Sequence, residues 1–343
     1  MGQRGRLTGA VVALAVAVLA MALITRFALA PVARFKRPRT VVVRPGEPLK
    51  AVAARLARRG VVRSGLALVL YGDLTGGARK IKPGEYAFSG GESAAQVLQH
   101  LVNGDFLTIA VTIPEGMTMR QIADRLQASR LVCARDFIQA ATRGPIPTAL
   151  GLRPLGLEGY LFPAAYRFAP NVSADQITAT MAARFYRILT PAVEQRLSEL
   201  GMTDRGLVTL ASIIEREAKV PGERPIIASV FYNRMKLGMP LQSDSTAQYN
   251  RSWEAKSAVL AVRRPSAFNT YDFRGLPPGP IANPGLASIM AALYPAQTNY
   301  LYFVATRDGS DLFSRTYAGH LRNIARIRQS SLASPPASNS SEH

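Results

Sequence analysis

The alternation of apolar and polar residues changes along the chain, and its first segment is uniformly apolar. Nineteen residues without a charge, LTGAVVALAVAVLAMALIT, occupy positions 7–25 between Arg6 and Arg26. At about 1.5 Å rise per residue, a helix of this length spans roughly 28 Å, close to the hydrocarbon thickness of a bilayer. The pattern predicts a transmembrane helix at 7–25, preceded by a short N-terminus at 1–6 and followed by a linker at 26–39.

A cleaved signal peptide is the alternative interpretation of this segment, because Ala28-Leu29-Ala30 resembles a cleavage site. The length of the apolar run and Pro31 directly after that site favour a retained anchor. The charges on either side conflict with an extracytoplasmic location of the rest of the chain. More basic residues follow the span than precede it, so a positive-inside count places the C-terminal part in the cytoplasm.

After residue 40 the pattern changes to short β-like runs followed by amphipathic helices. Residues 41–43, a Pro-Gly turn and apolar residues with helical spacing at 49–56 predict strand, turn and helix. The layout returns at 111–126, and a related unit lies at 82–101. We therefore expect an α+β fold with a compact module of two helices on a small sheet at 40–104. A larger mixed α+β domain follows at 105–328, and the Ser- and Pro-rich residues 329–343 are predicted to be a disordered tail.

The clearest helical period occurs at 206–219, GLVTLASIIEREAK. Leu207, Leu210, Ala211, Ile214 and Ala218 share one face at 100° per residue. Glu215 and Glu217 flank this face, and Glu215 lies nearer its centre. Burial favours the protonated form of a carboxyl, and cleavage of a glycosidic bond needs a protonated acid. The alternative is that both glutamates are solvated residues at the rim of an amphipathic helix.

The segments after this helix combine a second helix with long irregular stretches. Residues 223–238 predict a helix that begins at Glu223 and Pro225 and stops at Gly238. The density of Pro and Gly at 268–285 excludes regular structure and is typical of a stiff loop on the wall of a groove. We expect Asn269, Tyr271 and Asn283 to be exposed there, where they would meet a sugar chain, although such loops are often only connectors.

Charge and composition limit the remaining function classes. The net charge of +20 favours contact with polyanions such as nucleic acid, anionic lipid or a wall polymer. Against nucleic acid, Lys and Arg are scattered and no recognised basic element appears. Because Cys133 is the only cysteine, an internal disulfide and a Cys-rich zinc site are excluded. Cys133 lies in an apolar run, which predicts that it is buried. The three histidines are far apart in sequence, and neither metal-ligand spacing nor a phosphate-binding Gly-rich loop appears, so we expect no metal and no cofactor.

Several motifs together carry a specific resemblance. They occur in this order: LEGYLFPAAY, ASIIEREA, SVFYNR, LQSDST, FNTY, GLPPGPIANPG and YLYFV. This series resembles the endolytic murein transglycosylases, the YceG-like family, over roughly residues 40–325. The resemblance implies a cofactor-free lyase that cleaves the MurNAc–GlcNAc bond of nascent peptidoglycan strands and leaves 1,6-anhydroMurNAc ends. Two departures, Ala164-Ala165 and Ser245, stand where the family commonly has Asp-Thr and Pro.

The same resemblance assigns roles to residues and to the parts of the chain. It implies that Glu215 is the catalytic acid and base, that the 40–104 module is a LysM-like accessory module and that 105–328 is the catalytic domain. It also implies an anchor in the cytoplasmic membrane with this domain on the outer side, with peptidoglycan synthases as further candidate partners. Our candidates for substrate binding are Gln242, Ser243, Asp244, Asn269, Tyr271 and Asn283.

Two alternatives to this activity stay open at the level of sequence. Ordinary hydrolysis of the glycan needs a second carboxylate, for which Glu217, Glu223 and Asp244 are candidates. A catalytically silent protein that only binds the wall polymer would tolerate Glu215→Gln without loss of cellular function.

Overall fold

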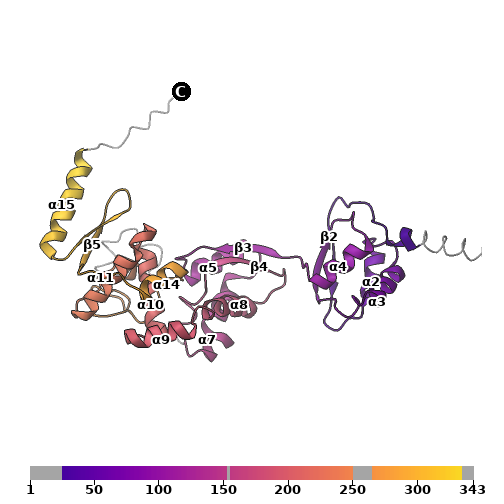
Figure 1. Cartoon of the computed structure of the whole chain (residues 1–343), viewed down its shortest axis with the longest axis horizontal. Helices are drawn as coiled ribbons and strands as arrows, with labels where there is room; N and C mark the ends of the chain where they lie inside the picture. Colours follow the sequence, from indigo (N-terminus) through magenta and orange to yellow (C-terminus); the bar gives the residue numbers. More distant parts are fainter. Residues whose placement is uncertain (1–24, 153–154, 250–264, 334–343) are drawn as a thin grey trace, which may run out of the picture. The chain divides into compact units, whose positions relative to one another are not determined.

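The computed structural model describes residues 25–152, 155–249 and 265–333, which form two compact units divided at Ile109 (Figure 1). Unit 1 comprises the described residues up to Ile109, and unit 2 comprises the described residues from Ala110 onward. The predicted membrane span at 7–25 lies outside the described residues except for Thr25. Within the described ranges, no helix is both long enough and apolar enough to cross a membrane.

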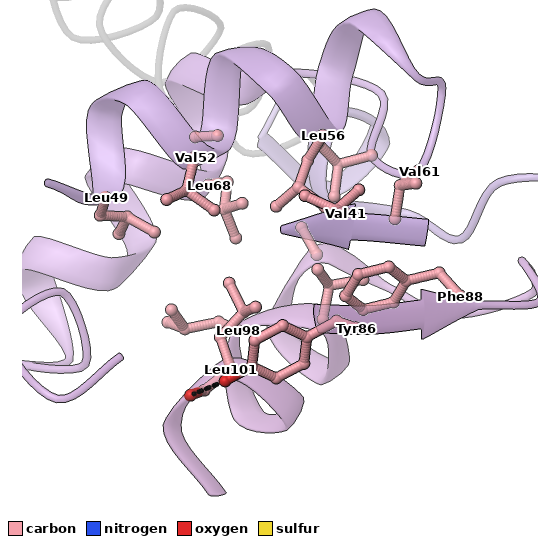
Figure 2. Packing of buried hydrophobic residues seen from close by; sticks show 14 of the residues in the cluster. Val41, Leu49, Val52, Leu56, Val61, Leu68, Tyr86, Phe88, Leu98 and Leu101 are labelled. Atoms are coloured by element: carbon pink, nitrogen blue, oxygen red, sulfur yellow. Dashed lines mark hydrogen bonds between the residues drawn. The ribbon is translucent and has the colours of Figure 1, made fainter. Parts of the chain in front are cut away.

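Unit 1 is a two-stranded antiparallel sheet covered by helices. Its elements are β1 (Arg39–Val43), α2 (Leu49–Arg58), α3 (Gly65–Leu74), β2 (Gly84–Phe88) and α4 (Ala94–Asn103). The register pairs Val41 with Tyr86. Strand alternation turns Val41 and Val43 inward, where they meet the buried face of α2, whereas Val42 is 47% exposed. Figure 2 shows this core, with Leu56 of α2 and Leu68 of α3 packed toward the sheet.

Two features of unit 1 differ from the predictions. Helix α3 was not expected, because its sequence GLALVLYGDL is apolar on several sides and lacks the contrast that marks an amphipathic helix. Ser64 begins it by accepting a hydrogen bond from the Ala67 amide. The predicted linker at 26–39 is in fact packed on the unit, since Phe35 contacts the core and its amide donates to the Ser89 carbonyl. Gly90 permits this approach, because a side chain there would collide with the backbone of Ala33.

Unit 2 contains most of the helices and two further sheets. Strand β3 (Ile109–Ile113), which leads in from unit 1, pairs with β4 (Ala164–Phe168), and β5 (Tyr302–Ala305) is antiparallel to β6 (Asp311–Ser314). Four helices form one packed group in which α6 (Ala134–Arg143) contacts the other three, which are α5 (Met119–Ala128), α7 (Pro145–Ala149) and α8 (Ala174–Tyr186). The other helices among the described residues of this unit are α9 (Pro191–Leu200), α10 (Asp204–Glu217), the 3-10 turn η1 (Pro221–Glu223), α11 (Arg224–Lys236), α12 (Asp244–Gln248), α14 (Leu286–Leu293) and α15 (Tyr317–Ala333).

The strongest periodic segments were predicted correctly. Helix α10 (Asp204–Glu217) contains all of the expected 206–219 segment except Ala218 and Lys219, and Leu207, Leu210 and Ile214 are fully buried. Residues 268–285 contain neither helix nor strand, as their Pro and Gly content indicated. A mixed α+β architecture with small sheets is confirmed.

Two local predictions were wrong. Helix α15 continues to Ala333, so residues 329–333 are helical instead of belonging to a disordered tail. No Gly or Pro interrupts residues 320–334, so the two serines at 330–331 extend the helix. Cys133 is exposed and not buried, because it is the residue that precedes α6 and its side chain makes no capping bond.

The core of unit 1 generates a test of packing. Leu56→Ala should lower the free energy of unfolding of this unit by about 2–5 kcal/mol, because Leu56 is fully buried and its loss leaves a cavity. Leu74→Ala is the matched control, since Leu74 is 87% exposed and its truncation should change stability by less than about 0.5 kcal/mol. Urea unfolding followed by hydrogen exchange of β1 and β2 peptides measures both. Equal losses in the two variants would contradict this assignment of the core.

Candidate functional site

The last turn of α10 holds Glu215 at the edge of the core of unit 2. Ile213 and Ile214, which precede it, are fully buried and fix the direction of this turn. The Glu215 side chain is itself only 7% exposed. Its carboxylate is therefore largely shielded from water, and hydrogen bonds and charges act on it more strongly than they do in bulk solvent.

One oxygen of this carboxylate is bound by the start of another helix. Glu215 Oε2 accepts hydrogen bonds from the Gly285 amide at 3.0 Å and from Ser288 Oγ at 2.8 Å. Gly285 directly precedes α14 as its N-cap residue, so its amide is one of the free donors at a helix N-terminus. The N-terminal end of a helix carries a partial positive charge, which stabilises a carboxylate at this position.

Arg224 completes the centre from the first residue of α11. Its Nε donates to Ser288 Oγ at 3.0 Å, and its Nη2 lies 3.5 Å from Glu215 Oε1. We call Glu215, Arg224, Gly285 and Ser288 the Glu215 centre. Oε2 has two short donors and Oε1 has one long contact, so Oε1 is the oxygen better placed to exchange a proton with a bound substrate.

A second carboxylate, Glu115, reaches the same centre from the turn after β3. The Glu115 carboxylate occupies the space that a side chain on Gly285 would need, so a larger residue at 285 would displace the Glu115 side chain. The neighbouring Gly116 faces the Glu215 side chain, since a Cβ at Gly116 would lie 3.6 Å from Glu215 Cγ. Sequence reasoning missed Glu115, because it interpreted the Pro-Glu-Gly segment only as a turn between strand and helix.

Asn283 ties together the segments that surround the Glu215 centre. Its side chain donates to the Met117 carbonyl and to Glu158 Oε1, both at 2.9 Å, and accepts from the Leu161 amide at 2.9 Å. Its own backbone bonds to Gly116 and Met117. Asn283 is fully buried, so the prediction that it is exposed was wrong. Both donors and the acceptor of its side-chain amide bind these internal partners.

Glu158 is the buried acid of this network. Besides Asn283, it accepts hydrogen bonds from the Met119 amide and from Tyr249 Oη. Burial, which disfavours the charged form, raises the pKa of Glu158 to about 7, although these hydrogen bonds oppose the change. Glu158 thus links the turn at 114–119 to residues 158–161 and 283.

The predicted binding segment at 242–244 forms a separate loop next to α10. The Gln242 backbone has a φ of 53°, in the left-handed region that residues other than glycine rarely adopt. The loop is held there by Arg234, whose buried guanidinium donates to the Leu241 carbonyl and to Gln242 Oε1. Strain of this kind is often retained at functional positions.

Ser243 connects this loop to the helix that carries Glu215. Its hydroxyl donates to Glu217 Oε1, and its amide donates to Thr270 Oγ1 at 3.1 Å. Ser243 is 3% exposed, whereas Gln242 and Asp244 beside it are exposed. Glu217, two residues from Glu215, thereby fixes the start of α12.

The loop at 268–272 packs beside residues 242–246. Tyr271 is partly exposed, and its hydroxyl donates to Asp244 Oδ1 at 2.8 Å. Asn269 is fully buried, so its predicted exposure was also wrong. Its side chain donates to Asp272 Oδ2 at 2.8 Å and shapes the turn. The structure therefore brings all six predicted binding residues around the end of α10, but only Gln242, Asp244 and Tyr271 are open to solvent.

The acidic residues considered for a second catalytic group have structural partners. Glu217 bonds to Ser243, Asp244 bonds to Tyr271, and both oxygens of Glu223 accept from the Asp311 amide. Across residues 25–152, 155–249 and 265–333, no three His, Cys, Asp or Glu side chains gather closely enough to hold a metal ion.

This arrangement defines a two-unit α+β protein with a buried carboxylate at a helix N-terminus. The YceG-like family model matches residues 41–326, so the chain belongs to the YceG-like family. It is 34% identical over 299 residues to a Bacillus subtilis protein named endolytic murein transglycosylase, covering 80% of this chain and 81% of the relative. A relative of the same name from Streptococcus pneumoniae serotype 2 is 29% identical over 334 residues, and this chain spans 60% of its length.

A solved structure supports the fold. The crystal structure of a YceG-like protein from Listeria monocytogenes matches with a TM-score of 0.57 and 31% sequence identity, covering 84% of this chain and 99% of that one.

The Glu158 network generates a prediction of pH dependence. The folded-state pKa of about 7 lies above the ordinary value of 4.5, so the folded chain binds this proton more tightly than the unfolded chain. The resulting stability is complete below pH 4.5 and is lost as the pH rises to about 7. Glu158→Gln should remove this dependence, so the variant should gain on the order of 2–3 kcal/mol relative to wild type between pH 5 and pH 8.

Urea unfolding of both proteins at several pH values measures this difference. Glu194→Gln, which alters an exposed glutamate on α9, is the control and should follow the wild-type curve. Parallel curves for wild type and Glu158→Gln would show that Glu158 does not hold the extra proton.

Proposed function

We propose that this protein is an endolytic peptidoglycan lytic transglycosylase in which Glu215 is the catalytic acid and base. The observation that carries the proposal is the buried Glu215 carboxylate at the start of α14, in a chain of the YceG-like family. The names of the Bacillus and Streptococcus relatives support the reaction class. The substrate is then the glycan strand of peptidoglycan.

The reaction requires one carboxylate used twice. Protonated Glu215 gives its proton to the glycosidic oxygen, and the bond from that oxygen to the anomeric carbon of MurNAc breaks. The 6-hydroxyl of the same MurNAc attacks the anomeric carbon and gives its proton to the Glu215 carboxylate. The products are a free 4-hydroxyl on GlcNAc and a 1,6-anhydro ring, Glu215 is again protonated, and no water is consumed.

The rest of the Glu215 centre supports the intermediate stage of this cycle. Between the two proton transfers Glu215 is a carboxylate, and the Gly285 amide and Ser288 hydroxyl already point at Oε2. Such preorganised donors stabilise a charge without reorganisation during the reaction. Arg224 holds Ser288 in place and adds a positive charge near Oε1.

Substrate binding is proposed for the loops beside α10, which would form one wall of a groove. Gln242, Asp244 and Tyr271 are open to solvent and offer an amide, a carboxylate and an aromatic ring to a sugar chain. Ser243, Asn269 and Asn283 are buried, and we propose that they act by positioning these loops. The strained backbone of Gln242 supports a functional role for this position.

The remaining parts of the proposal concern location and partners. The apolar segment at 7–25 supports a single-pass anchor in the cytoplasmic membrane, with both units on the outer side. We propose that unit 1 is a LysM-like accessory module and that unit 2 is the catalytic domain. An enzyme so anchored would meet nascent strands near peptidoglycan synthases and would end their elongation.

The central prediction concerns Glu215→Gln. Purified peptidoglycan digested by the wild-type chain should yield internal fragments with 1,6-anhydroMurNAc ends, and mass spectrometry detects them. Glu215→Gln should lower this yield by at least about 100-fold, because the amide can neither donate nor accept the required proton. Glu194→Gln is the matched control and should retain activity, since Glu194 lies exposed on α9.

The products separate the alternatives. Reducing ends instead of anhydro ends would establish hydrolysis, and Glu115→Gln would then test the second carboxylate at the centre. If folded wild-type protein yields neither product but retains peptidoglycan, the chain is a binding protein.

A second prediction concerns the proposed binding loop. Tyr271→Ala should raise KM by about 5- to 30-fold with a smaller change in kcat, because a ring stacked on a sugar contributes roughly 1–2 kcal/mol. Tyr271→Phe keeps the ring and loses only the bond to Asp244, so its KM should stay close to wild type. Equal effects of the two variants would assign the role to the hydroxyl instead.

A further inference from the structure

Helix α3 of unit 1 presents an unusual row of exposed leucines. Leu66, Leu70 and Leu74 follow one another at intervals of four residues, and they are 72%, 56% and 87% exposed. The interval places them along one side of the helix. The opposite side is the one that packs inward, where Leu68 is fully buried and Gly72 abuts Leu49 of α2. The leucine row therefore contributes nothing to the core of unit 1.

An aromatic residue extends this apolar surface. Phe27 is 66% exposed, and the guanidinium of Arg63 lies 4.6 Å from the centre of its ring. Arg63 also donates two hydrogen bonds to the Pro31 carbonyl, at 3.1 and 3.2 Å. Because Arg63 stands two residues before α3, it fixes Phe27 near the end of the helix where Leu66 lies. Figure 1 shows residues 25–30 on the same side of unit 1 as α3.

Unit 1 is rich in basic residues, and some of them lie at the two ends of this row. Residues 25–109 contain 14 Lys and Arg against 5 Asp and Glu. Arg26 and Arg63 lie at one end of the leucine row, and the exposed Arg79 and Lys80 follow the other end. A shallow hollow of about 710 Å³ is lined by residues 32–37, Arg39 and Gly60, four of which are basic. The one acidic residue on α3 is Asp73, which is exposed and reduces the positive charge next to the row.

We propose that α3 and Phe27 form a surface of unit 1 that docks on an anionic lipid bilayer. Leucine and phenylalanine side chains enter the acyl region, and the basic residues around them reach anionic headgroups. Each basic residue near such a surface contributes about 1 kcal/mol. A protein partner would not by itself require this charge, whereas an anionic bilayer matches both the apolar row and the basic rim.

The position of the surface in the chain supports the same occupant. The uncharged run at 7–25 ends two residues before Phe27. A segment of this length and composition is suited to a bilayer, so the adjoining surface of unit 1 would lie at the headgroups. The proposal does not depend on the catalytic assignment of Glu215, and the two can fail separately.

The test places a fluorophore on the row in the full chain. Cys133→Ser removes the native thiol and supplies a favourable residue at the start of α6. Leu70→Cys carries an environment-sensitive dye, and Val42→Cys is the matched control, because Val42 is a comparably exposed apolar residue on the sheet face opposite Val41 and Val43. Both proteins are reconstituted into phosphatidylcholine vesicles, with or without phosphatidylglycerol, that carry brominated acyl chains.

With phosphatidylglycerol, the dye at position 70 should shift to shorter wavelength and be quenched at least about two-fold more than the dye at position 42. High salt should weaken this difference. Arg79→Gln combined with Lys80→Gln should also weaken it, and circular dichroism checks that this variant is folded.

Three outcomes would overturn the proposal. Equal quenching at positions 42 and 70 would mean that α3 has no preference for the bilayer. Quenching at position 70 that ignores phosphatidylglycerol would remove the role of the basic rim. A blue shift at position 70 without quenching by brominated lipid would show that protein covers the row, whether unit 2, a second copy of this chain or another partner.

Discussion

The buried hydrogen bonds of Asn283 are the constraint on which the candidate site depends. They join the turn at 116–117, the segment at 158–161 and the entry to α14. The entry to α14 lies more than 100 residues from the other two segments in the chain, and this entry and the turn both bring groups to Glu215. The entry to α14 supplies the Gly285 amide and Ser288, and the turn supplies Glu115 and the space left by Gly116. Loss of these bonds would leave buried polar groups without partners, which raises the free energy of this arrangement. The turn and the entry to α14 would then no longer be held together beside Glu215.

Hydrophobic periodicity predicted the helix that carries Glu215, but it did not predict which other elements contact this residue. The spacing of Leu207, Leu210 and Ile214 predicted α10 and placed Glu215 beside its apolar face, because helix geometry is local. The partners of Glu215 lie on α11, α14 and the turn after β3, and no local pattern encodes those contacts. Glu115 was missed for this reason, whereas the Pro-Glu-Gly turn that carries it was recognised.

Exposure was the property predicted least well in irregular segments. A Pro- and Gly-rich stretch is normally a surface loop, so Asn269 and Asn283 were expected to face solvent. Both are fully buried, because their amide groups supply internal partners that such a loop cannot obtain from a helix or a sheet. Helix α3 shows the converse, since its leucines predict burial by composition and yet three of them are exposed.

These two departures have different physical meanings. A buried asparagine whose donors and acceptor are all used lowers the free energy of the fold, so its position is explained by stability alone. An exposed row of leucines adds no such stability, because apolar surface left in water forgoes about 25 cal/mol for each Å². Nothing within unit 1 offsets that loss at Leu66, Leu70 and Leu74, and their retention on one side of α3 therefore calls for a contact outside the unit. The basic residues at both ends of the row make an anionic surface the best match for that contact.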